Sequence, residues 1–223
     1  MSSSITQIKK IIVYIPFIEI KIKGYEMLNN KTVNKRLEST KEYIDALQDK
    51  YSKLCVVRVD LGYKKPHSDN IVLDDANDDF NRMLNNRRGK PSVFKDQVGY
   101  MCLKEYTEDK GVHLHTIFIY DGNKVQKDAH MGDKIGEYWK ELTDGKGSHF
   151  NCNRKKYKHK GVGMLHHSDT DKREILDEYV TSYLCKTDEE QDLAPVKNNS
   201  KDRAFVRGIM PKSKSKIGRP RNK

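Results

Sequence analysis

The chain has 223 residues, and its 43 Lys and Arg against 32 Asp and Glu give a formal net charge of +11 at pH 7. Hydrophobic residues make up 35% and charged residues 34%, a composition typical of a highly charged globular protein rather than a membrane protein. The longest apolar run, Ile11–Ile20, is interrupted by Pro16 and Glu19 and is too short to span a bilayer. We therefore expect no membrane partner.

The first half of the chain predicts a helix over Thr32–Lys50 and then a strand over Leu54–Leu61, a run rich in β-branched residues. A helix over Asp74–Arg88 follows, because its acidic first turn suits the positive end of a helix dipole. Val98–Tyr106 and Val112–Tyr120 are typical of strands, and the short polar turn between them ends in glycine. These two strands should form a hairpin.

The second half predicts a helix over Met131–Leu142, a basic loop over Gly145–Lys160, a short strand over Val162–His166 and a helix over about Asp171–Lys186. Asp171 and Glu174, three residues apart, are typical of the start of that last helix. This order of elements predicts an α+β fold with a ferredoxin-like βαββαβ core, in which helices back a central antiparallel sheet.

We expect one main domain over residues 51–210, an N-terminal extension over 1–50 that packs on it, and a flexible basic tail over 211–223. In the extension, Ile11–Ile15 could add an edge strand. The four cysteines show no C-x-x-C spacing, and most lie in apolar runs. They are therefore interpreted as free core thiols, which favours a reducing cytoplasm over a disulfide scaffold or a structural zinc site.

Two segments, 145–160 and 212–223, each carry six basic residues and no acidic one. The remaining 31 basic residues nearly balance the 32 acidic ones, so the excess charge lies in two patches on a nearly neutral body. Such patches are typical of surfaces that bind a phosphate backbone. A solvated loop and a solubilising tail are the alternative.

The most informative stretch is His113-Leu114-His115, because residues two apart on a strand point to the same face. Neutral imidazole is a common metal ligand. In the predicted hairpin register Glu105 lies opposite His113 and Leu103 lies opposite His115, and directly opposed residues share a face. The register thus predicts a site for a Lewis-acidic divalent cation. A slip of one residue would remove the carboxylate, and solvent-facing histidines are the alternative.

Tyr179 and Tyr183 are four residues apart and should lie on one face of the last helix, with Lys186 one further turn along. A tyrosine hydroxyl can attack a phosphodiester if a cation stabilises its phenolate and a metal polarises the phosphate. Both tyrosines also belong to a regular apolar stripe, so packing in the core is the alternative.

The His-hydrophobic-His strand, the acidic third ligand and the later tyrosine helix together resemble the HUH endonuclease superfamily. From roughly Lys53 to the C-terminus the chain is also similar to the inovirus-type gene II replication protein family and to bacterial proteins with a YagK/YfjJ C-terminal domain. The motifs that carry this resemblance are Arg58-Val59-Asp60-Leu61, Gly111-Val112-His113-Leu114-His115, Ile135-Gly136-Glu137-Tyr138-Trp139, Gly145-Lys146-Gly147, Tyr183-Leu184-Cys185-Lys186 and Gly218-Arg219-Pro220-Arg221.

The resemblance implies the Rep nuclease fold and a rolling-circle replication initiator. Such an enzyme nicks one strand at an origin, stays attached to the 5′ phosphate through a tyrosine and later rejoins the strands. The implied partners are single-stranded origin DNA and, since the chain has no Walker-type ATPase sequence, a host helicase and polymerase in the bacterial cytoplasm.

The resemblance also implies roles for individual residues. The first nucleophile would be Tyr183 and the second Tyr179, although Tyr179 could instead be the primary nucleophile or purely structural. Lys186 would stabilise a phenolate or contact the phosphate. Mg²⁺ or Mn²⁺ would be held by His113, His115 and Glu105.

The basic loop interleaves Phe150 and Tyr157 with its charges, which suits single-stranded DNA held by backbone charge and base stacking. Gly218-Arg219-Pro220-Arg221 resembles an arm that enters a minor groove. A disordered basic tail is the alternative there. The residues expected to bind DNA are Lys146, Arg154, Lys155, Lys156, Lys158, Arg219 and Arg221.

Three other functions remain open at this point. A relaxase or a single-strand transposase would use the same chemistry. A non-catalytic DNA-binding regulator would bind DNA without forming a covalent adduct. An unrelated histidine-metal hydrolase would need neither Tyr183 nor DNA.

Overall fold

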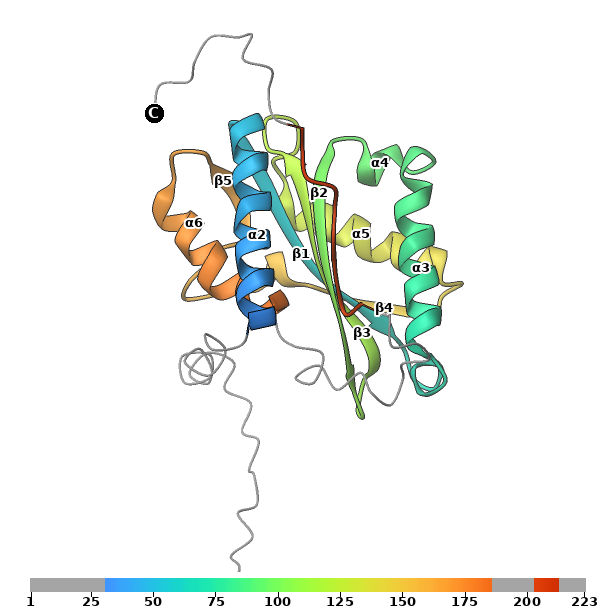
Figure 1. Ribbon diagram of the computed structural model, residues 1–223. Helices are drawn as coiled ribbons and strands as arrows, with labels where there is room; N and C mark the ends of the chain where they lie inside the picture. Colours follow the sequence, from blue (N-terminus) through green and yellow to red (C-terminus); the bar gives the residue numbers. More distant parts are fainter. Residues whose placement is uncertain (1–30, 186–202, 213–223) are drawn as a thin grey trace, which may run out of the picture.

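A computed structural model describes residues 31–185 and 203–212, in which one antiparallel sheet lies between two groups of helices (Figure 1). The helices and strands, in chain order, are α2 (Lys31–Lys50), β1 (Lys53–Tyr63), α3 (Leu73–Asn85), α4 (Pro91–Phe94), β2 (Gln97–Thr107), β3 (Gly111–Asp121), α5 (Asp128–Leu142), β4 (Gly147–Asn151), β5 (Gly163–His166), α6 (Thr170–Leu176) and β6 (Phe205–Arg207). Short helical turns complete the description: η1 (His67–Asp69), η2 (Asn86–Arg88), η3 (Cys152–Arg154), η4 (Asp177–Thr181) and η5 (Ser182–Cys185).

The sheet has the strand order β4-β1-β3-β2-β6, and β5 pairs with β1 on the same edge as β4. All described pairs are antiparallel. The helix α3 carries the chain from β1 to β2 past β3, and α5 carries it from β3 to β4 past β1. This is the predicted βαββαβ order, and the α+β fold class is confirmed.

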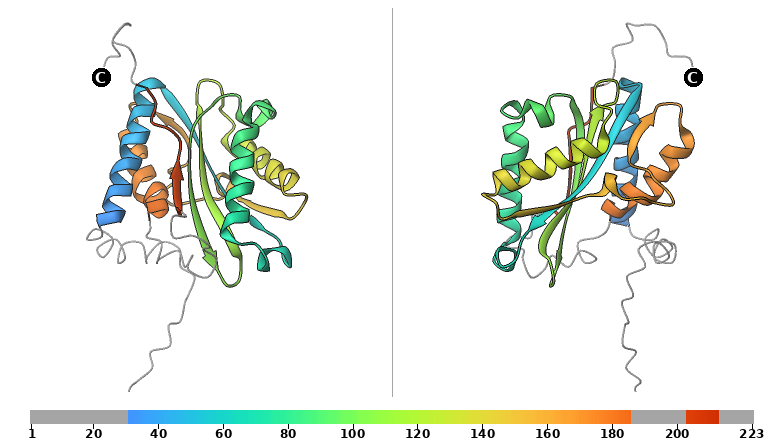
Figure 2. Two further views of the ribbon diagram at one scale, coloured as in Figure 1. Left: turned by 45° about the vertical axis from the view of Figure 1, so that its right-hand side comes forward. Right: turned by 180° about the vertical axis from the view of Figure 1, so that it is seen from behind.

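The two sheet faces are covered by different helices (Figure 2). On one side α5 packs against β1, where the indole Nε1 of Trp139 donates a 2.8 Å hydrogen bond to the carbonyl of Gly62. On the other side α2 packs so closely against Gly99 of β2 that an added Cβ would lie 2.8 Å from the Tyr43 hydroxyl. We call these the α5 face and the α2 face.

The helix α2 belongs to the main core, since Tyr43, Ile44 and Leu47 are buried in the same cluster as the sheet residues. All four cysteines are buried and free, as predicted. The expected edge strand at Ile11–Ile15 and the tail beyond Lys212 lie outside the described residues. No helix in the described segments combines the length and the apolar composition needed to cross a membrane.

The prediction of a basic loop over Gly145–Lys160 is wrong at its start, where Gly147–Asn151 forms β4. Alternate residues of β4 face α5. The His149 ring contacts Gly136, and the Asn151 side-chain amide donates a hydrogen bond to the carbonyl of Ala129. Because the residues that face α5 are glycine and polar side chains, the strand shows none of the hydrophobic alternation by which a strand is usually predicted.

The last predicted helix is also regular over only part of its range. Its N-cap is Asp169, whose carboxylate accepts a 3.1 Å hydrogen bond from the backbone N–H of Lys172, so the helix begins before the predicted pair of acidic residues. The α-helix ends at Leu176, and the π-helical turn η4 and the 3-10 turn η5 follow. Tyr179 and Tyr183 therefore lie in these turns and not in the regular α-helix that was predicted for them.

Candidate metal centre

The β2–β3 hairpin has the predicted register. Glu105 pairs with His113 and Leu103 pairs with His115, so both imidazoles and the carboxylate point to the α2 face. The strand β3 begins at Gly111, whose φ of +68° favours glycine. An added Cβ there would also lie 2.5 Å from the carbonyl oxygen of Ser68, so a larger residue at position 111 would clash with the backbone.

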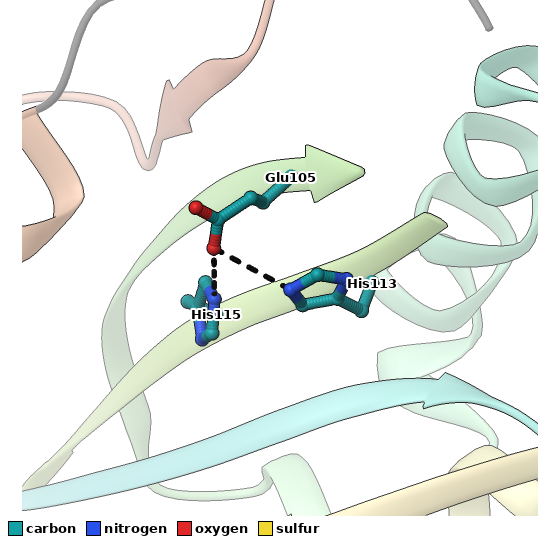
Figure 3. Close-up of side chains that lie close together, drawn as sticks. All are labelled: Glu105, His113 and His115. Carbon is teal, nitrogen blue, oxygen red and sulfur yellow. Dashed lines mark hydrogen bonds and ion pairs between the residues drawn. The ribbon is translucent and has the colours of Figure 1, made fainter. Parts of the chain in front are cut away.

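The three side chains converge on one carboxylate oxygen (Figure 3). The Oε2 atom of Glu105 lies 2.8 Å from Nε2 of His115 and 3.4 Å from Nε2 of His113. Each of the three residues is at most 8% exposed. Within the described residues they form a group whose candidate ligand atoms all lie within 4.8 Å of one another.

The Nδ1 atom of each imidazole faces an acceptor outside the group. His113 Nδ1 lies 3.0 Å from the carbonyl oxygen of Gly111, and His115 Nδ1 lies 2.9 Å from Oδ1 of Asp60. Each Nδ1 can therefore carry the ring proton, which leaves the Nε2 lone pairs directed at Glu105. Two nitrogen lone pairs and a carboxylate oxygen then meet in a buried space, and a mixed set of imidazole and carboxylate ligands suits a divalent cation.

The charged groups around His115 stabilise one another's ionised forms. Burial opposes ionisation of Asp60, but His115 and Arg58 together hold the pKa of its carboxyl well below the usual range. Burial likewise disfavours a charged His115, but Asp60 and the hydrogen bond to Glu105 raise its pKa overall. Asp60 is therefore a carboxylate that orients the candidate ligand His115, an arrangement common behind metal-bound histidines.

Tyr183 reaches the same group from η5. Its hydroxyl lies 3.2 Å from Oε2 of Glu105, to which it donates, and 3.4 Å from Nε2 of His115. Its ring meets the edge of the His115 ring at a centroid distance of 4.9 Å. Burial and the neighbouring Glu105 carboxylate raise the pKa of Tyr183 well above its ordinary value. This hydroxyl therefore needs a nearby positive charge before it can react as a phenolate at neutral pH.

Arg58 supplies one such charge. Its side chain is 17% exposed, its guanidinium carbon lies 5.0 Å from the centroid of the Tyr183 ring, and its Nε lies 3.4 Å from Oδ1 of Asp60. Sequence reasoning assigned no role to Arg58 or Asp60. Alternation along β1 places them on one face, but their position beside His115 depends on the long-range pairing of β1 with β3.

Tyr179, also expected in the catalytic group, contacts a residue outside that group. The Tyr179 ring stacks on His159 at 4.8 Å and an interplanar angle of 12°. The regular α-helix predicted to carry both tyrosines ends at Leu176, and Tyr179 in η4 and Tyr183 in η5 have different aromatic neighbours. Lys186 lies outside the described residues.

The expected DNA-binding residues that the structure describes are exposed: Lys146, Arg154, Lys155, Lys156 and Lys158. Arg154 is held by Asp133, with Nε 2.9 Å from Oδ1. The segment is anchored beside the candidate centre, because Asn153 Oδ1 accepts a 2.8 Å hydrogen bond from the backbone N–H of Arg58. The remaining two, Arg219 and Arg221, lie outside the described residues.

Comparison with known protein families gives a match over most of the chain. The family model described as the YagK/YfjJ C-terminal domain matches residues 19–205, which include α2 and every residue of the candidate metal centre. No curated protein and no solved structure matches the chain.

Proposed function

The chain belongs to the YagK/YfjJ C-terminal domain family, and from this membership and the candidate metal centre we propose a metal-dependent nicking endonuclease and strand transferase of the HUH type. The observation that carries the proposal is the Tyr183 hydroxyl, 3.2 Å from Glu105 and 3.4 Å from His115. A nucleophile is thereby held against two of the three residues that would bind the cation. The βαββαβ order of elements is consistent with the Rep nuclease fold.

In this proposal Glu105, His113 and His115 hold Mg²⁺ or Mn²⁺, which when bound polarises the scissile phosphate as a Lewis acid. Tyr183 attacks the phosphorus of single-stranded DNA. A bond forms between the tyrosine oxygen and phosphorus, the bond from phosphorus to the 3′ oxygen breaks, and the tyrosine proton is balanced by protonation of that leaving oxygen. The product is a 5′-phosphotyrosine linkage and a free 3′ hydroxyl, and reversal rejoins the strands.

Arg58 supplies a positive charge in addition to the one that the sequence analysis expects from Lys186, since its guanidinium lies against the Tyr183 ring. A positive charge there stabilises the developing phenolate and the phosphate it attacks. Tyr179 is kept as the candidate for a second attack, because its ring stacks on His159, outside the group of Glu105, His113 and His115.

The biological role that best fits this chemistry is initiation of rolling-circle replication in a bacterial cytoplasm, with a host helicase and polymerase as partners. A relaxase or a single-strand transposase would use the same residues. The alternative from a different class is a non-catalytic DNA-binding regulator. Unlike a nicking enzyme, it would bind DNA without forming a covalent adduct.

The experiment incubates the full chain with Mn²⁺ and single-stranded circular DNA from its own genetic neighbourhood, followed by denaturing gels and mass spectrometry. We expect a nucleotide adduct on Tyr183 that Tyr183→Phe and His113→Ala abolish. Tyr51→Phe, directly after α2, is the matched control and should retain the adduct. Tight binding with no adduct would favour the regulator, and cleavage that survives Tyr183→Phe would favour an unrelated metal hydrolase.

A further inference from the structure

Phe150 lies in the edge strand β4, and the core does not cover its aromatic side chain. It is 54% exposed, and the other large hydrophobic residues exposed in the described segments, Ile209 and Met210, are aliphatic and follow β6 at the opposite edge of the sheet. Single exposed hydrophobic residues are common and need no function. The position of Phe150 relative to the candidate metal centre is what distinguishes it.

Phe150 belongs to the same cross-strand row as the metal-binding histidine. In the sheet register Phe150 pairs with Asp60, and Asp60 pairs with His115. Directly opposed residues share a face, so Phe150 lies on the α2 face with the candidate metal centre. Its neighbours His149 and Asn151 confirm this orientation, because both contact α5 on the other face.

The chain beyond Phe150 is suited to a polyanion. After β4 the chain passes through η3 and then enters an exposed basic run that includes Lys155, Lys156 and Lys158. The hydrogen bond from the Arg58 backbone N–H to Asn153 fixes this run beside β1. An exposed aromatic ring next to a basic run is the arrangement by which proteins bind single-stranded nucleic acid, with bases stacked on the ring and phosphates near the charges.

We propose that Phe150 is the stacking platform for an unpaired nucleobase of the strand whose phosphate lies at the candidate metal centre. The inference deepens the proposed function and rests on it for the position of that phosphate. Two strand spacings separate β4 from β3, roughly 10 Å. That distance corresponds to about three stacked nucleotides at ~3.4 Å each. Phe150 therefore contacts a base close to the scissile phosphate, and it selects single strands because a paired base has no free face to offer.

The test is binding of the full chain to a fluorescent single-stranded oligonucleotide in Mg²⁺, measured by anisotropy over a range of salt concentrations. Phe150→Ala should weaken binding roughly 5- to 150-fold, the equivalent of about 1–3 kcal/mol. It should leave the salt dependence unchanged, because no charge is removed. Phe150→Trp should restore binding, whereas Phe150→Leu should not. Ile209→Ala is the matched control for loss of an exposed apolar side chain.

A second measurement locates the contact. An oligonucleotide that carries 5-iodouracil should photo-crosslink to Phe150, as identified by mass spectrometry of the digested protein. Full restoration of binding by Phe150→Leu would overturn stacking, and so would wild-type affinity in Phe150→Ala. If the wild-type chain binds single strands through Phe150 but forms no adduct on Tyr183, the stacking inference stands and the nicking proposal fails. If the wild-type chain binds no single-stranded DNA, both fail.

Discussion

The Nδ1 atom of His115 lies 2.9 Å from Oδ1 of Asp60, the residue that pairs with it directly across β1 and β3. This contact fixes the ring orientation that turns Nε2 toward Glu105. An acidic partner of this kind also makes the imidazole a better metal ligand. We therefore expect Asp60 to strengthen cation binding, although it is not itself expected to bind the cation.

Asp60→Asn should weaken Mn²⁺ binding about 10- to 100-fold, because the amide preserves the shape of the side chain but removes its charge. The affinity can be measured from the free Mn²⁺ signal in electron paramagnetic resonance. Asp79→Asn is the control, since Asp79 accepts a hydrogen bond from Tyr63 on the far face of the sheet and should not affect affinity. Equal affinities in the wild type and Asp60→Asn would contradict the orienting role.

Glu105→Gln should abolish the stabilisation of the fold by Mn²⁺. A cation that binds only the folded state at 100 times its Kd adds about 2.7 kcal/mol to the free energy of unfolding. Without the cation, the variant should be close to the wild type in stability, because an amide keeps the shape of the side chain and can still form a hydrogen bond with Nε2 of His115. Thermal unfolding with and without Mn²⁺ measures both effects. Glu108→Gln, in the exposed turn of the same hairpin, should behave as the wild type.

Arg58→Met should slow formation of the Tyr183 adduct by roughly 10²- to 10³-fold at saturating Mn²⁺ and DNA, because one preorganised charge is lost beside the nucleophile. Removing Arg58 also costs stability, because the partly buried Asp60 carboxylate then keeps only His115 as its partner. Arg58→Lys retains a charge and should recover part of the rate. Because substitution of Arg58 also lowers stability, rates are compared only at temperatures where circular dichroism shows each variant folded.

Arg82→Met is the matched control for that comparison, since Arg82 pairs with Asp79 on α3, away from Tyr183. It should retain the wild-type rate. An Arg58→Met variant that is folded and equally fast would remove Arg58 from the mechanism.

The parts of the centre that were predictable from sequence are those fixed by local structure. Glu105, His113 and His115 lie in one hairpin, so alternation and a short turn were enough to place them on one face. Asp60 and Arg58 lie on β1, whose pairing with β3 joins segments more than 50 residues apart in the chain, and no local pattern specifies that register.

The errors in the prediction have physical causes of the same kind. The strand β4 was missed because its residues that face α5 are glycine and polar side chains held by tertiary contacts. The helix that carries the tyrosines was predicted as regular because Ile175, Leu176, Val180 and Leu184 keep helical spacing in the sequence. Tertiary packing instead ends the α-helix at Leu176 and directs Tyr183 to His115 and Tyr179 to His159.

The basic run after η3 should act through phosphate charge alone. Lys155 and Lys156 are exposed, and a basic side chain that neutralises one phosphate of a single strand contributes about 0.7 to the slope of log K against log salt. The double variant Lys155→Ala, Lys156→Ala should therefore reduce the slope by about 1.4. It should weaken binding to all single-stranded sequences alike, because phosphate contacts carry no sequence information.

The same anisotropy titrations that test Phe150 measure this slope. Lys124→Ala is the control, since Lys124 lies within ion-pair distance of Asp96 and Asp121, in the turn after β3, and should leave the slope unchanged. The two kinds of variant thus separate two contributions: loss of the lysines lowers the salt dependence, whereas loss of Phe150 lowers affinity at every salt concentration. An unchanged slope in the double lysine variant would mean that the phosphates contact another surface, and the basic run would then be only a solvated segment.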